Sequence, residues 1–296
     1  MTSSTVHFKR VALIGIGLIG SSLARVIRRD NLADHIVINA RTQKSLDTAT
    51  DLGLADSTTL DPAEAVKGAD LVVFCTPIGS YEALAKTIVA NLETGCIVSD
   101  VGSVKKMVID ILAPLMPDGV QLVPGHPIAG TEHSGPEAGF AELFQDRWCI
   151  LTPAKDADQT AVDKVTALWT TANMKVEIMD AVHHDHVLAI TSHLPHLIAY
   201  TIVGTATDLA DDLEQEVVKY SASGFRDFTR IAASDPTMWR DIFLNNREAV
   251  LDILGRFSED LTAMQRAIRH GEGDTLVDAF TRTREIRRKI IDAKQD

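Results

Sequence analysis

A glycine-rich turn near the N-terminus constrains the fold of this chain more than any other feature. Gly15, Gly17 and Gly20 form a G-x-G-x-x-G pattern that follows an apolar run at 11–14 and opens a helical pattern extending to about Arg29. The first glycine permits a tight turn, the second admits a pyrophosphate to the backbone, and the third lets helix and strand pack closely. The free N–H groups of the helix favour phosphate there. The turn predicts a dinucleotide site formed by Gly15, Ile16, Gly17, Leu18, Ile19 and Gly20, the alternative being a glycine-rich turn without a ligand.

The rest of the first half alternates strand-like and helical patterns. Further strand-like runs lie at 36–38, 71–75, 96–99, 120–123, 148–152 and 175–179, and helical stretches at 81–91, 104–113 and 158–172 separate several of them. This alternation predicts a mostly parallel, doubly wound sheet of the Rossmann type. From about Ala181 only helical patterns remain, at 183–209, 211–221, 235–270 and 273–293. We therefore predict an α/β chain with a dinucleotide-binding domain at 1–180 and an all-α domain at 181–296.

The end of the second strand-like run bears on the choice of cofactor. NAD enzymes usually place a carboxylate about 20 residues after the glycines, where it accepts hydrogen bonds from the ribose. This chain has Asn39, Arg41 and Thr42 instead. Arg41 and Thr42 could bind a 2′-phosphate, which favours NADP, whereas a solvated Arg41 with Asn39 on the ribose would fit NAD. Thr76 and Pro77, after the run at 71–75, are further candidates for cofactor contact.

Composition excludes several classes of partner. The chain has 296 residues and a net charge of −12, so it lacks the basic surface that nucleic acids require, and an anionic substrate would need locally placed arginines or lysines. No run approaches the roughly 18 apolar residues of a membrane span, and the first ten residues do not resemble a secretory signal. Cys75, Cys96 and Cys149 form no close pair and fit core positions in a reducing compartment. We expect a cytoplasmic protein.

An ordered series of motifs resembles the prephenate/arogenate (cyclohexadienyl) dehydrogenase family in its single-function form. Besides the glycine turn, the matching segments are D-V-G-S-V-K at 100–105, G-H-P-I-A-G-T at 125–131, H-D at 184–185, S-H-L-P-H at 192–196, G-F-R-D-F-T-R at 224–230 and S-D-P-T-M-W at 234–239. They run in order through nearly the whole chain. The resemblance implies oxidative decarboxylation of prephenate, arogenate or both, with hydride transfer to NADP or NAD, in tyrosine biosynthesis.

The resemblance also implies roles for individual residues. His126 would accept the proton of the ring hydroxyl, a role that suits an imidazole because its ordinary pKa lies near neutral pH. Ser103 would contact the same hydroxyl, although it could also be the N-cap of a helix. Arg230 would grip a substrate carboxylate, which a planar guanidinium can bind with two hydrogen bonds. Arg226 and Asp227 would orient Arg230, and the pocket would be lined by Thr131, His196 and Trp239, with Trp239 reaching in from a partner subunit.

The histidines at 183–196 are not expected to form a metal site. They could bind zinc, but no metal-site motif accompanies them and hydride transfer needs no metal, so we expect no bound metal.

The helical half is expected to form a homodimer, and tyrosine to act as a feedback inhibitor. The rival interpretations are a β-hydroxyacid dehydrogenase-like or imine-reductase-like enzyme and a non-catalytic NADP-sensing protein. The choice between prephenate and arogenate stays open.

Overall fold

The structure is a computed structural model that describes residues 6–208, 219–220 and 222–292. It divides into two compact units, Met1–Asn246 and Arg247–Asp296. The predicted domain boundary at residue 180 lies inside the first unit, which joins the nucleotide-binding half to several helices. Most of the helix predicted at 211–221 lies outside the described residues.

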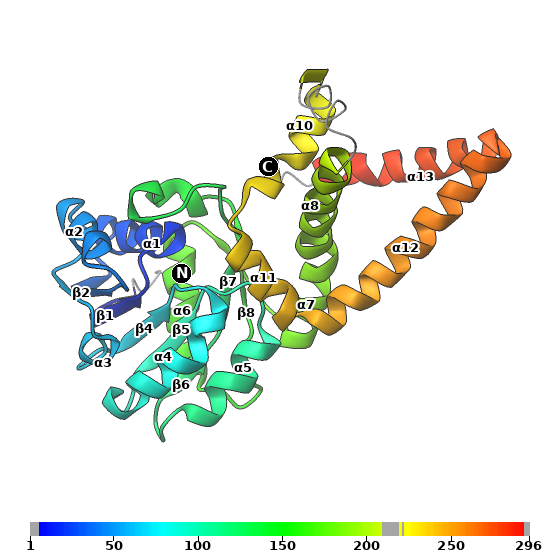
Figure 1. Cartoon of the computed structure of the whole chain (residues 1–296). Helices are drawn as coiled ribbons and strands as arrows, with labels where there is room; N and C mark the ends of the chain where they lie inside the picture. The colour runs from blue at the N-terminus through cyan, green and yellow to red at the C-terminus, as the bar shows by residue number, and fades with distance from the viewer. Residues whose placement is uncertain (1–5, 209–218, 221, 293–296) are drawn as a thin grey trace. The chain divides into compact units, whose positions relative to one another are not determined.

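The first unit is built on a six-stranded, entirely parallel sheet (Figure 1). Its strand order is β3-β2-β1-β4-β5-β6, in which the direction of strand addition reverses between β1 and β4. Such a reversal opens a crevice at the carboxyl ends of the strands, where dinucleotides bind. The predicted Rossmann-like fold is thus confirmed. The strands are β1 (Phe8–Ile14), β2 (Ala33–Asn39), β3 (Ser57–Thr59), β4 (Leu71–Phe74), β5 (Ile97–Asp100) and β6 (Gln121–Val123).

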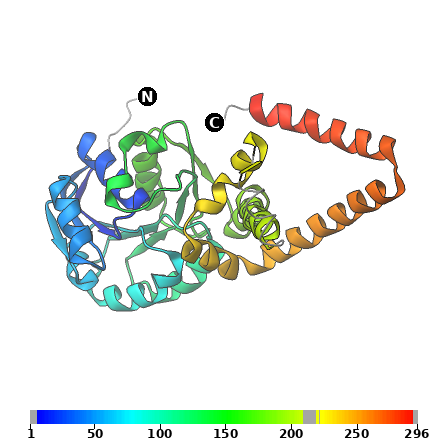
Figure 2. The same cartoon turned by 45° about the horizontal axis from the view of Figure 1, so that its top comes forward.

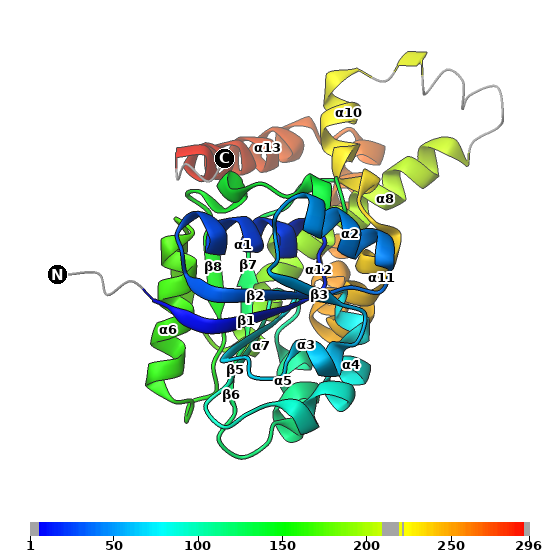
Figure 3. The same cartoon turned by 90° about the vertical axis from the view of Figure 1, so that its left-hand side faces the viewer.

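Alternation along the strands divides the core between the two faces of the sheet. In β1, Val11 and Leu13 pack on one face, and Ala12 and Ile14 on the other, because successive side chains of a strand point to opposite sides. The first face is covered by α1 (Leu18–Arg29), α2 (Gln43–Asp51) and α6 (Gln159–Thr171). The second face is covered by α3 (Pro62–Ala65), α4 (Tyr81–Ile88) and α5 (Lys106–Leu112), as Figure 3 shows from the side. Short 3₁₀ turns lie at Ile78–Ser80, Val89–Asn91, Ala113–Leu115, Pro136–Ala138 and Ala141–Phe144.

A second, three-stranded sheet corrects the prediction of a single one. It comprises β7 (Gly125–Pro127), β8 (Trp148–Leu151) and β9 (Lys175–Ile178) in the order β7-β8-β9, with β7 antiparallel to β8. The sequence predicted β8 and β9 as strands of the main sheet and predicted no strand at His126. A three-residue strand that contains glycine and proline has no recognisable alternation, so only its pairing with β8 reveals it.

The helices of the first unit begin with one long segment. It consists of α7 (Ala181–Leu188), a π-helical turn η6 (Ala189–His193) and α8 (Leu194–Thr207). The wider turn accommodates Pro195, which has no N–H to donate to the preceding turn of the helix. α10 (Ser223–Thr229), the 3₁₀ turn η7 (Arg230–Ala233) and α11 (Pro236–Asn245) follow. Trp239 and Ile242 of α11 join the hydrophobic core that also contains Tyr81, so α11 is anchored to the nucleotide-binding half.

The second unit consists of α12 (Arg247–His270) and α13 (Gly273–Asp292), which Figure 2 shows as two long helices joined by a short turn. The sequence predicted a single helix at 235–270. The structure interrupts it at Asn246, which ends α11 with a non-helical backbone at φ −109° and ψ 32°.

Candidate active site

The glycine turn has the geometry that a dinucleotide site requires. Gly15 adopts a φ of +102°, and a Cβ there would lie 2.7 Å from the Thr76 side chain. A Cβ on Gly20 would lie 2.5 Å from the carbonyl oxygen of Gly15, so this glycine allows α1 to approach the strand. Gly17, by contrast, has no atom within 4 Å of the position of its Cβ. The turn therefore leaves open space at the N-terminus of α1, where the positive end of the helix dipole favours a pyrophosphate.

The three candidate residues at the end of β2 and just after it have different surroundings. The Asn39 side-chain amide donates a hydrogen bond to the carbonyl of Thr59 (3.1 Å), which ties β2 to β3. Thr42 is the N-cap of α2 and accepts a hydrogen bond from the amide of Ser45 (3.2 Å). Arg41 is exposed. Thr42 therefore already has a structural role, and Arg41 is the residue of the three that is available to a phosphate.

Ser80 holds the segment after β4. Its hydroxyl lies 2.8 Å from the Thr76 hydroxyl and 2.7 Å from the carbonyl oxygen of Pro77. Thr76 and Pro77 follow the carboxyl end of the strand beside β1, so both predicted contacts lie at the edge of the sheet where the cofactor crevice opens.

A buried ion pair fixes the start of β7 against the end of β5. The ammonium of Lys105 lies 2.5 Å from the Asp100 carboxylate and donates to the carbonyl of Gly125 (2.7 Å), while the amide of Gly125 donates to Asp100 (3.2 Å). Both side chains are fully buried. Burial lowers the pKa of Lys105, and the Asp100 carboxylate opposes this effect. The pair places His126, the next residue along β7, at the carboxyl edge of the main sheet, and neither Lys105 nor Asp100 was among the predicted site residues.

His126 belongs to a chain of hydrogen-bonded side chains. Its Nδ1 lies 2.9 Å from Nε2 of His184, and Nδ1 of His184 lies 2.8 Å from Oδ1 of Asp185. The Asp185 carboxylate accepts hydrogen bonds from the backbone amides of Lys105 (2.8 Å) and Lys106 (2.9 Å). These bonds cap α5, so the interpretation of Ser103 as its N-cap is wrong: the N-cap residue is Lys105, and the capping carboxylate comes from α7.

Burial keeps the imidazoles of this region neutral. It lowers the pKa of His126 well below the usual value, and nearby His184, Lys105 and His193 lower it further. Burial likewise lowers the pKa of His184, and it lowers that of His193 to about 4. A neutral imidazole has a free lone pair, so His126 can accept a proton at neutral pH. The side-chain amide of Asn246 donates to the carbonyl of Asp185 (2.8 Å) and lies 3.0 Å from Nδ1 of His193, a link that no motif in the sequence predicted.

The predicted substrate-binding residues fall into two groups. His196 stacks on Trp239 with ring centroids 3.7 Å apart, and Trp239 is buried in its own chain, so the expectation that it reaches in from a partner subunit does not fit its packing. Burial lowers the pKa of His196, and the positive charge of Arg230 lowers it further.

Arg230 itself is exposed and lies 3.6 Å from Glu132, on the segment that follows β7. Arg226 and Asp227 are exposed on α10, and among the described residues Asp227 makes no ion pair with Arg230. That they orient Arg230 stays a prediction.

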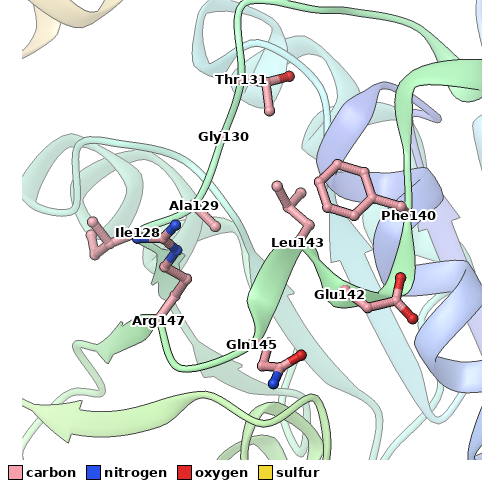
Figure 4. A pocket seen from close by; sticks show the side chains of 9 residues that line it. All are labelled: Ile128, Ala129, Gly130, Thr131, Phe140, Glu142, Leu143, Gln145 and Arg147. Atoms are coloured by element: carbon pink, nitrogen blue, oxygen red, sulfur yellow. The ribbon is translucent and has the colours of Figure 1, made fainter. Parts of the chain in front are cut away.

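Thr131 lies in a pocket of about 290 Å³ beside the segment after β7 (Figure 4). The lining residues come from 128–131 and from 140–147, and Arg147 lies beside Ile128. The Thr131 hydroxyl accepts a hydrogen bond from the amide of His133 (3.2 Å). Ser103 is half-buried in the loop between β5 and α5, and its hydroxyl has no hydrogen-bond partner within the part of the chain that the structure describes.

No cluster of three histidine, cysteine or acidic side chains in the described ranges has the arrangement of a metal site. One described segment, Ala181–Thr207, is long and apolar enough to cross a membrane by length and composition alone. It carries His184, Asp185 and His193, whose buried hydrogen bonds join it to α5 and to Asn246. These contacts hold one side of the segment against the rest of the first unit.

Two family models match consecutive parts of the chain. The nucleotide-binding domain of prephenate dehydrogenase matches residues 23–178, and the dimerization domain of prephenate dehydrogenase matches residues 180–282. Together they cover most of the chain, and they meet close to the predicted domain boundary.

Individual relatives agree with these matches. A cyclohexadienyl dehydrogenase of Zymomonas mobilis is 41% identical over 95% of both chains, and a prephenate dehydrogenase of Bacillus subtilis is 31% identical over 94% of this chain and 75% of its own length. The crystal structure of prephenate dehydrogenase from Aquifex aeolicus, in complex with hydroxyphenyl propionate and NAD⁺, superposes with a TM-score of 0.90 at 33% identity, covering 97% of this chain and all of the other. The predicted family is thereby confirmed: this chain belongs to the prephenate dehydrogenase family.

Proposed function

We propose that this protein catalyses the NAD(P)-dependent oxidative decarboxylation of prephenate, arogenate or both, in tyrosine biosynthesis. The observation that carries the proposal is the position of His126, a neutral buried imidazole at the carboxyl edge of a sheet whose glycine turn fits a dinucleotide. The similar enzymes from Zymomonas mobilis and Bacillus subtilis are named for the oxidation of this class of substrate.

The reaction divides the work between a base and an anion clamp. Bound NAD(P) supplies the hydride acceptor. His126 takes the proton of the ring hydroxyl as the hydride leaves, and Ser103, in the neighbouring loop, contacts the same hydroxyl. Arg230 binds a substrate carboxylate and exchanges its contact with Glu132 for that bond. His196, Trp239 and Thr131 line the pocket.

The buried ion pair argues against the main rival enzymes. A β-hydroxyacid dehydrogenase-like or imine-reductase-like mechanism is expected to use a catalytic lysine. The buried lysine next to His126 is Lys105, and its ammonium is occupied by Asp100 and the carbonyl of Gly125. It lies inside the core and serves the packing of β7, so it is a poor candidate for contact with a substrate.

The preferred cofactor in this proposal is NADP. Arg41 is exposed directly after β2, and no carboxylate occupies the end of that strand to repel a 2′-phosphate. We further propose a homodimer formed by the helices of the domain at 181–296, and a cytoplasmic location. The three cysteines are unpaired, and burial raises the pKa of each thiol, which fits a reducing compartment.

The test is the absorbance at 340 nm after NADP⁺ is mixed with the protein and either prephenate or arogenate. We expect reduced cofactor with at least one substrate, and initial rates with both decide the preference.

His126→Asn should lose about 10²–10⁴-fold in kcat, the usual contribution of a general base. Arg230→Ala should mainly raise KM for the substrate. Tyrosine should compete with the substrate because it keeps the carboxylate that Arg230 binds. A wild-type protein inactive with both substrates and both cofactors would refute the proposed function.

A further inference from the structure

We propose that His184 and Asp185 are positioning residues that hold the proton of neutral His126 on Nδ1 and leave the lone pair of Nε2 facing the reacting hydroxyl. The inference rests on the proposed function, because it concerns how His126 acts as the base of that reaction. Its evidence is the continuous chain of hydrogen bonds from His126 through His184 to Asp185.

The direction of each hydrogen bond follows from the fixed end of the chain. Both oxygens of Asp185 accept backbone N–H groups, Oδ1 from Lys105 and Oδ2 from Lys106, so the carboxylate cannot rotate without losing both bonds. A carboxylate only accepts, so Nδ1 of His184, 2.8 Å away, must carry the proton and donate it. A neutral imidazole has a single N–H, and Nε2 of His184 is then an acceptor.

The position of the proton on His126 follows in the same way. Its Nδ1 lies 2.9 Å from the acceptor nitrogen of His184, so it must be the donor in that bond. His126 is neutral and has its proton on Nδ1, which leaves Nε2 with a free lone pair. The opposite arrangement would place two lone pairs against each other between the histidines and would leave a proton on the nitrogen that has to act as the base. The hydrogen-bond chain therefore selects the reactive tautomer.

The hydrogen bonds from His126 through His184 to Asp185 also stabilise the positive charge that forms on His126 during the reaction. As hydride leaves C4 of the ring, the hydroxyl proton moves to Nε2 of His126 and the C4–O bond becomes a carbonyl. Loss of CO₂ then returns an electron pair to this oxygen, which takes the proton back from His126 as the ring becomes aromatic. The substrate thus loses a hydride and CO₂, and the proton that His126 accepts returns to the product. While His126 is positive, its Nδ1–H points toward His184, which in turn donates to the anionic Asp185.

The other surroundings of His126 oppose a positive charge on its imidazole. Burial lowers its pKa, His184, Lys105 and His193 lower it further, and the Asp100 carboxylate is occupied by Lys105. Asp185 is therefore the anion that reaches His126 through hydrogen bonds. His193 takes no part in the chain, because its Nδ1 faces the side-chain amide of Asn246.

The first experiment reads the tautomer directly. Long-range ¹H–¹⁵N correlation spectra of histidine-labelled protein with NADP⁺ should show His126 protonated at Nδ1, with its signals assigned by their loss in His126→Asn. In His184→Phe, which removes the acceptor but keeps a ring, we expect a shift toward the Nε2–H form. An Nε2–H tautomer for His126 in the wild type would overturn the proposal. This measurement needs no substrate, so its outcome is separate from that of the proposed function.

The second experiment tests whether His184 acts through His126. With a substrate that the wild type oxidises, His184→Phe should lower kcat at least about tenfold with little change in KM, and His184→Gln, whose carbonyl can accept from Nδ1, should recover part of the loss. Adding His184→Phe to His126→Asn should lower kcat little further, because the two residues act as a unit. Equal losses of kcat in the wild-type and His126→Asn backgrounds would show a structural role for His184 and refute its action through His126. His183→Phe, on the exposed side of α7, is the matched control and should behave as the wild type.

Discussion

At the scale of single residues, neighbouring side chains at the end of β2 have unequal freedom to bind a ligand. Asn39 is committed to the carbonyl of Thr59 and Thr42 to the amide of Ser45, whereas Arg41 is exposed. A hydrogen bond to a charged group contributes about 1.5–3 kcal/mol. The selectivity between NADP and NAD can therefore depend on a single guanidinium.

Arg41→Ala should raise KM for NADP about 10- to 150-fold, which is the same 1.5–3 kcal/mol expressed as affinity, and leave KM for NAD nearly unchanged. The measurement is the initial rate at varied concentrations of each cofactor. Lys44→Ala is the matched control, because it removes an exposed positive charge from the first turn of α2. Equal effects of Arg41→Ala on both cofactors would show that the residue supports the fold.

At the scale of elements, the segment formed by α7, η6 and α8 places polar groups in the core. It contributes His184, His193 and His196, and burial is the largest cause that lowers the pKa of each. A buried neutral histidine takes up a proton more readily when the chain unfolds. Because of these histidines, the free energy of unfolding should fall as the pH is lowered.

His193 permits a calculation, since its pKa falls from 6.5 to about 4. The folded value lies below the unfolded one, so its stabilising effect is complete above pH 6.5 and is lost as the pH falls toward 4. By pH 5 the loss from this residue is on the order of 2 kcal/mol. We expect the free energy of unfolding, measured by denaturant titration, to fall less between pH 7.5 and 5 in His193→Asn than in the wild type. The exposed-site variant His183→Asn should keep the wild-type slope, and an unchanged slope in His193→Asn would contradict the assignment.

At the scale of the whole molecule, apolar side chains remain exposed along the helices of the matched dimerization domain. Val182, Ile190 and Ile202 are 44%, 52% and 39% exposed on α7, η6 and α8. Exposed apolar surface along one segment is typical of a protein interface. A second copy of the chain would remove these side chains from water.

Sedimentation at micromolar concentration should give twice the chain mass of 32.2 kDa. Ile190→Asp should shift the equilibrium toward the monomer, since it would bury a charge in the interface. Leu60→Asp is the matched control, because Leu60 is also 52% exposed but lies in the nucleotide-binding half. A stable wild-type monomer, or equal effects of the two variants, would refute the dimer.

The sequence by itself determined the features that depend on local pattern. The glycine turn, most strands of the Rossmann sheet and the helical second half follow from residue types at fixed spacings, whereas the role predicted for His126 follows from the family resemblance. Gly15 and Gly20 illustrate this, because the steric reason for each glycine lies within the turn and the elements beside it. The family also follows from motifs that can be read in order along the chain.

Only the tertiary structure decided which distant groups meet. β7 is too short to recognise without its pairing to β8, and the second sheet was therefore missed. Asp185 caps α5 from a position 80 residues away, and the order His126–His184–Asp185 joins two elements that are 58 residues apart. Hydrogen bonds are short and directional, so their partners depend on how the elements pack, and no spacing in the sequence encodes that contact.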